Sequence, residues 1–85
     1  MDSLAALKVR TAIARMEAGN FGDVKPIGEG ASERRIDWGP GYRIYFGRDG
    51  VRLVVLLAGG SKKGQRADIE RAKVYWSDYK SRKED

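Results

Sequence analysis

Three segments with strand-like composition follow one another at short intervals, at residues 32–38, 42–47 and 52–58. They are separated by Gly-Pro-Gly at 39–41 and by Arg-Asp-Gly at 48–50, sequences that favour tight turns. Such connections are too short for a parallel crossover, so the pattern predicts an antiparallel meander. The third segment is almost entirely aliphatic, which predicts a central strand covered on both faces for part of its length.

Helical patterns flank this meander. Apolar residues from Ala5 to Met16 recur at helical spacing, which predicts a helix over residues 3–18. A second helix is predicted from about residue 64 to residue 80, with a frayed end at 81–85. A short extended stretch at 24–27 suggests a possible fourth strand. The chain is therefore expected to form one α+β domain over residues 1–85, with helices and sheet in two layers.

The absence of histidine and cysteine excludes several kinds of chemistry. Disulfides, thiolate nucleophiles and zinc knuckles need cysteine. A Ser-His-Asp hydrolase or a two-histidine ribonuclease needs histidine. Any catalysis by this chain must therefore rest on Arg, Lys, Tyr, Asp or Glu.

Basic residues outnumber acidic ones by 17 to 12, and the calculated pI is near 9.7. This excess suggests a polyanionic partner, nucleic acid first, although a solvated surface with a mild charge bias is an equal reading of charge alone. No phosphate-loop glycine pattern and no metal-site spacing of acidic residues is present, so we expect neither a cofactor nor a metal. The longest apolar run has six residues, which predicts a cytoplasmic protein without a membrane segment.

Side-chain alternation along the strands indicates where a binding surface would lie. Arg43 and Tyr45 share one face of their strand, and Arg35 falls on the same face of the strand before it. With Lys62 and Lys63 at the rim, this face has the residues to hold a phosphate backbone and stack a base. The alternative is an ordinary solvated sheet face in which Arg35 pairs with an acidic neighbour. Arg34 points to the opposite, core-facing side, where it must reach an edge or find a carboxylate.

The region from residue 19 to residue 72 closely resembles toxin subunits of the RelE/ParE superfamily, and among them the HigB-type addiction module killer proteins; the whole resemblance covers about residues 4 to 80. The resemblance rests on three blocks of sequence. These are Gly19-Asn20 with Gly22-Asp23 and Lys25; Glu33, Arg35-Ile36-Asp37, Gly39-Pro40-Gly41-Tyr42-Arg43 and Tyr45-Phe46; and Gly59-Gly60, Lys62, Gln65, Asp68-Ile69 and Ala72.

The resemblance implies a curved antiparallel sheet with helices on one face and a basic concave surface on the other. Family members begin with an edge strand and a first helix, and this chain begins near the end of that helix. An unfilled sheet edge would invite pairing with a second copy, giving a homodimer. The same comparison implies that Glu33 dilutes the positive charge of the site, because some relatives carry lysine there.

The implied activity is cleavage of mRNA on the translating ribosome, by attack of a ribose 2′-hydroxyl on the adjacent phosphate. Carried over by position, Arg43 and Lys63, or Lys62 beside it, bind the transition-state charge, and Arg35 positions the backbone or assists proton transfer. The remaining RNA contacts are assigned to Lys62, Tyr45, Arg34 and Arg66.

The resemblance also implies partners: the ribosome with its mRNA, and a helix-turn-helix antitoxin of the HigA type through which operator DNA is bound. Two other functions stay open at this point. The chain is alternatively a ParE-like inhibitor of DNA gyrase, or a truncated and inactive relative that retains antitoxin binding and regulation.

Overall fold

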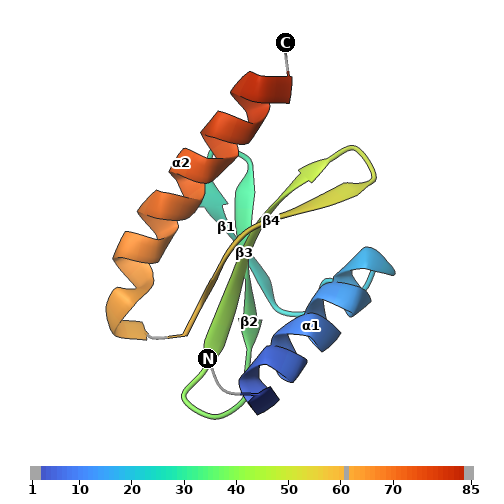
Figure 1. Ribbon diagram of the computed structural model, residues 1–85, viewed down its shortest axis with the longest axis vertical. Helices are drawn as coiled ribbons and strands as arrows, with labels where there is room; N and C mark the ends of the chain where they lie inside the picture. Colours follow the sequence, from blue (N-terminus) through green and yellow to red (C-terminus); the bar gives the residue numbers. More distant parts are fainter. Residues whose placement is uncertain (1–2, 61, 84–85) are drawn as a thin grey trace.

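The computed structural model describes residues 3–60 and 62–83, and they form an α+β fold, as the sequence predicts (Figure 1). A helix precedes four consecutive antiparallel strands, and a short 3-10 turn leads into a second helix. The elements are α1 (Ser3–Glu17), β1 (Val24–Gly28), β2 (Ala31–Ile36), β3 (Tyr42–Asp49), β4 (Arg52–Gly59), η1 (Lys62–Gly64) and α2 (Gln65–Lys83).

The four strands lie in the order β1-β2-β3-β4, so each pairs with its neighbour in the chain. The possible fourth strand is confirmed as β1. The prediction of a central position for residues 52–58 is wrong, because β4 pairs with β3 alone and forms an edge of the sheet. Its aliphatic composition has another cause, because both helices contact β4, one from each face. The cover is incomplete, since Val55 is 42% exposed.

The two helices cover opposite faces of the sheet, which corrects the two-layer arrangement expected from the sequence. Ile44 and Phe46 of β3 pack in one cluster with α1, whereas Gly47 of β3 lies against Trp76 of α2. Successive residues of a strand point to opposite faces, so α1 and α2 must approach from different sides. Figure 1 shows the two helices separated by the strands. The face expected to be open is therefore partly covered by α2.

Helix α1 packs through the predicted apolar stripe. Ala5, Val9, Ala12 and Met16 are buried, and three of them join Ile44 and Phe46 in the main core cluster. Phe21, just beyond the helix, stacks on Phe46 with ring centroids 5.8 Å apart. This cluster fixes the α1 face of the sheet.

Trp76 holds helix α2 against the sheet, because its indole ring lies on Gly47 of β3. Trp76 is 5% exposed, and its Nε1 donates a hydrogen bond to the Glu29 carbonyl oxygen at 3.0 Å. Near the far end of the helix, the Tyr79 hydroxyl donates to Asp49 Oδ2 at 2.7 Å, and Lys83 pairs with the same carboxylate. These contacts explain why the helix continues to Lys83, three residues beyond its predicted end at residue 80. Residues 81–83 are therefore helical and not frayed, and residues 84 and 85 of the expected frayed end lie outside the described residues. No helix in the described part of the chain is both long and apolar enough to cross a membrane.

Candidate functional site

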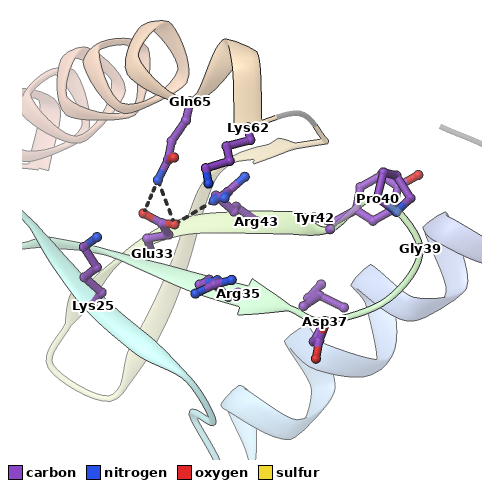
Figure 2. A pocket seen from close by; sticks show the side chains of 12 residues that line it. Lys25, Glu33, Arg35, Asp37, Gly39, Pro40, Tyr42, Arg43, Lys62 and Gln65 are labelled. Atoms are coloured by element: carbon purple, nitrogen blue, oxygen red, sulfur yellow. Dashed lines mark hydrogen bonds and ion pairs between the residues drawn. The ribbon is translucent and has the colours of Figure 1, made fainter.

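A basic pocket lies on the α2 face of the sheet, next to the first turn of α2 (Figure 2). The strand register brings its central residues together: Arg35 of β2 pairs directly with Arg43 of β3, and Glu33 pairs with Tyr45. Residues opposite one another on adjacent strands point to the same face. The pocket has a volume of about 390 Å³ and is lined by Lys25, Glu33, Arg35, Ile36, Asp37, Gly39, Pro40, Gly41, Tyr42, Arg43, Lys62 and Gln65.

Positive charge dominates the basic pocket. Four cationic side chains line it, against the carboxylates of Glu33 and Asp37; the cations are Lys25, Arg35, Arg43 and Lys62. Two like charges directly opposite on neighbouring strands are unfavourable, so the cross-strand arginine pair raises the electrostatic energy of the pocket. A bound anion would offset this repulsion, and a planar guanidinium suits a phosphate in particular.

Glu33 takes part in the pocket in a way that the sequence comparison did not anticipate. Its side chain is 1% exposed, and its Oε1 accepts a hydrogen bond from Arg43 Nε at 2.9 Å. The Gln65 side-chain amide, from the start of α2, donates to both carboxylate oxygens at 3.2 Å. Glu33 therefore does more than dilute the positive charge, because it binds the arginine at the base of the pocket.

Tyr45 does not form the exposed stacking surface that the alternation suggested, because its side chain is completely buried. The assignment of its face was correct, but α2 covers that face at this position. Asp68 of α2 and the Tyr45 ring both approach the backbone of Gly59. Burial, reinforced by the nearby carboxylates of Glu33 and Asp68, raises the pKa of the Tyr45 hydroxyl to about 12. An RNA base cannot stack on this ring without displacement of α2.

Replacement of Tyr45 by Phe is expected to leave stability unchanged or raise it by about 1 kcal/mol at pH 7. The buried hydroxyl makes no hydrogen bond to any described residue, so its loss removes a desolvation cost. In wild type, the unfolded tyrosine ionises near pH 10 and the folded one near pH 12. The stabilisation linked to this ionisation is therefore fully present below pH 10, and about 2–3 kcal/mol of it is lost as the pH rises to 12.

Urea unfolding of wild type and Tyr45→Phe at pH 7 and pH 11 measures both effects. The variant should lack the tyrosine part of the alkaline loss of stability, so the difference between the two proteins isolates that part. A variant that is more than 1 kcal/mol less stable at pH 7 would show that the hydroxyl has a stabilising partner.

Arg34 lies on the α1 face, away from the basic pocket. It pairs in register with Ile44, and its guanidinium donates a hydrogen bond to the Phe21 carbonyl oxygen. Gly22 makes room for this side chain, because a Cβ at Gly22 would collide with the Arg34 guanidinium. The expected partner was a carboxylate or solvent, but the structure gives one terminal amino group a backbone oxygen, and the buried Nε has no hydrogen-bond partner among the described residues. An RNA strand in the pocket would not meet Arg34.

Two basic residues that the sequence assigned to the site, Lys63 and Arg66, lie beside the pocket and not in it. Lys63 and Arg66 line an adjacent hollow with Ile69 and Glu70, and Lys62 and Gln65 belong to both depressions. Lys62, instead of Lys63, thus faces the pocket that contains Arg43 and Arg35 (Figure 2). The sequence left the choice between the two lysines open.

Sequence reasoning missed two residues of the pocket, Lys25 and Gln65, as functional candidates. Lys25 reaches the site because β1 pairs with β2 and brings it opposite Glu33. A hairpin between residues 24–27 and 32–38, with the Gly28-Glu29-Gly30 turn, was the signal that could have found it. Gln65 begins α2, and only the tertiary placement of that helix brings it to Glu33. Within residues 3–60 and 62–83, no group of acidic residues is arranged to hold a metal ion.

Comparison with known proteins identifies a relative in Haemophilus influenzae. No family model matches the chain, and no solved structure matches it. An uncharacterized protein of Haemophilus influenzae is 46% identical over 70 residues, which span 82% of this chain and 71% of that protein. Identity at this level over most of both sequences places the two proteins in one family. The chain belongs to the same family as this uncharacterized Haemophilus influenzae protein.

Proposed function

We propose that this chain is the toxin of a type II toxin–antitoxin module, of the RelE/ParE superfamily, and that it cleaves mRNA on the ribosome. One observation carries the proposal: Arg35 and Arg43 pair directly across two strands in a pocket that Lys25 and Lys62 also line. An arrangement of cations that repel one another is suited to an anionic ligand. The sequence resemblance over residues 19–72 supports a phosphodiester as that ligand.

In the proposed reaction, the ribose O2′ attacks the neighbouring phosphorus and the bond from phosphorus to O5′ breaks. The O2′ proton passes to solvent and the departing O5′ takes up a proton from solvent, leaving a cyclic phosphate and a 5′-hydroxyl. Negative charge grows on the phosphoryl oxygens in the transition state, so fixed cations accelerate the step. This chemistry suits a chain without histidine.

Each basic residue has its own role in the proposed reaction, according to its position in the pocket. Arg43, 11% exposed at the base of the pocket, stabilises the pentacovalent phosphorane. Lys62 stands beside it in the role first given to Lys63, and Arg35 positions the RNA backbone or assists proton transfer. Lys63 and Arg66, in the adjacent hollow, contact the strand as it leaves the pocket. Lys25 adds a contact on the β1 side.

The proposal includes a cytoplasmic location, since the substrate is mRNA bound to ribosomes. A helix-turn-helix antitoxin is the proposed inhibitor, and operator DNA is bound through it. A second copy of the chain is the proposed partner for the unpaired edge of β4.

Induction of the chain in bacteria, with mapping of mRNA 5′ ends before and after, tests this function. We expect growth arrest together with new ends inside translated codons, and no new ends in untranslated RNA. Growth arrest without mRNA cleavage would reject the ribonuclease and point to a target such as gyrase. A soluble, folded chain that neither arrests growth nor cleaves RNA would also contradict the proposal.

A further inference from the structure

The carboxylate of Glu33 is the most deeply buried charged group described in the fold, at 1% exposure. It lies on β2, between the strand positions of Lys25 and Tyr45, on the face that α2 covers. A carboxylate is costly to bury unless cations and hydrogen-bond donors compensate it. The compensation that Glu33 receives therefore indicates what the residue does.

Two donors hold this carboxylate, and they come from different parts of the fold (Figure 2). Arg43 approaches along β3 and donates through Nε at 2.9 Å. Gln65 approaches from the first turn of α2 and donates to both oxygens at 3.2 Å. The carboxylate is thereby held between the sheet and the helix.

The point of attachment on Arg43 has a consequence for the pocket. Glu33 binds the guanidinium at Nε, and no hydrogen bond joins the two terminal amino groups to any of residues 3–60 or 62–83. Those amino groups are the part of the guanidinium that binds phosphate in a fork. Arg43 lies opposite Arg35, which repels it, so an unanchored guanidinium would move away from the second arginine.

We propose that Glu33, supported by Gln65, is a positioning residue that holds Arg43 by its Nε edge and directs the terminal amino groups to the scissile phosphate. This inference rests on the proposed function. Glu33 itself does not reach substrate, because its carboxylate is buried and bonded to Arg43 and Gln65. Its contribution is to the rate of the phosphate chemistry.

A purely electrostatic role for Glu33 predicts the opposite outcome. If the carboxylate only lowered the positive charge of the pocket, its removal would tighten RNA binding and leave turnover unchanged or faster. If it positions Arg43, removal leaves binding unchanged or tighter but slows cleavage. Misplacement of a catalytic group by about 1 Å can cost on the order of 100-fold in rate.

The test compares Glu33→Gln with Asp37→Asn on mRNA bound to ribosomes. Asp37 is an exposed carboxylate that lines the same pocket and makes no described bond to Arg43, so its replacement removes the same charge without releasing the arginine. We expect single-turnover cleavage by Glu33→Gln to fall about 10- to 100-fold. We expect its affinity for an mRNA carrying a 2′-deoxynucleotide at the cleavage site to stay equal or rise, and the change in the cleavage rate of Asp37→Asn to be clearly smaller than the loss in Glu33→Gln.

Equal rates for wild type and Glu33→Gln would overturn the inference, and so would equal losses in the two variants. Gln65→Ala provides a second variant if Glu33→Gln does not fold, and we expect a smaller loss in the same direction.

Arginine side-chain NMR separates a failure of this inference from a failure of the proposed function. The Nε proton of Arg43 should exchange slowly in wild type and rapidly in Glu33→Gln, whether or not the chain cleaves RNA. A titration with inorganic phosphate should shift the signals of the terminal amino groups more than the Nε signal. Slow exchange without RNA cleavage by wild type would reject the ribonuclease while retaining the anchored arginine, and fast Nε exchange in wild type would reject the anchor itself.

Discussion

Arg43→Lys is expected to reduce RNA cleavage by at least about 100-fold while the protein stays folded. The lysine ammonium keeps a positive charge beside Glu33, so the buried carboxylate is still paired. A lysine cannot bind the carboxylate at one edge and present two parallel donors to a phosphate at the other. The loss should therefore appear in the rate of the chemical step, measured in a single turnover on mRNA bound to ribosomes.

The same substitution at an exposed arginine supplies the control. Arg10→Lys, on the outer surface of α1, should cleave RNA like wild type. Arg43→Ala is the poorer experiment, because it leaves the buried Glu33 carboxylate without a cation, a change that costs about 3–5 kcal/mol. Undiminished cleavage by a folded Arg43→Lys protein would contradict the proposal that the two terminal amino groups of Arg43 bind the phosphate.

Gly47→Ala is expected to destabilise the fold by about 2–3 kcal/mol, which corresponds to a fall in Tm of ~10–20 °C for a domain of this size. A Cβ at this position would lie 2.6 to 2.7 Å from three atoms of the Trp76 ring. The indole has little freedom to move away, since it is bonded to the Glu29 carbonyl oxygen and stacked on Tyr79 with centroids 5.5 Å apart. Thermal unfolding followed by circular dichroism measures the shift.

Gly64→Ala is the matched control for that experiment. A Cβ at Gly64 would lie 3.9 Å from a carboxylate oxygen of Asp68, which is ordinary van der Waals contact. We expect its Tm to lie within a few degrees of wild type. An unchanged Tm for Gly47→Ala would show that α2 does not rest on β3 through Trp76.

The strands and helices were predictable because local chemistry determines them. The turn sequences at 39–41 and around Gly50 leave no room for a crossover, and the stripe from Ala5 to Met16 is buried as the helical period requires. Alternation also put Arg35, Arg43 and Tyr45 on one face, which the register confirms. These features depend on residues close together in the chain.

The errors concern the placement of α2 and of the sheet edges, which depends on contacts between distant residues. The sequence of an aliphatic strand such as β4 does not distinguish a central strand, with a neighbouring strand on each side, from an edge strand with a helix on each face. Tyr45 was taken as exposed because nothing in its own strand shows that Asp68, 23 positions later, lies over the neighbouring backbone. The bond from Gln65 to Glu33 joins residues 32 positions apart and has no local signal.

The end chemistry of mRNA cleaved by the purified chain on programmed ribosomes tests the central claim most directly. We expect fragments with a 5′-hydroxyl and a 2′,3′-cyclic phosphate, formed by wild type and at least about 100-fold more slowly by Arg43→Lys. Fragments with a 5′-phosphate would show that a water molecule, instead of the ribose hydroxyl, attacks the phosphorus. Either that result or intact mRNA after incubation with folded wild-type protein would rule out the proposed ribose-hydroxyl attack.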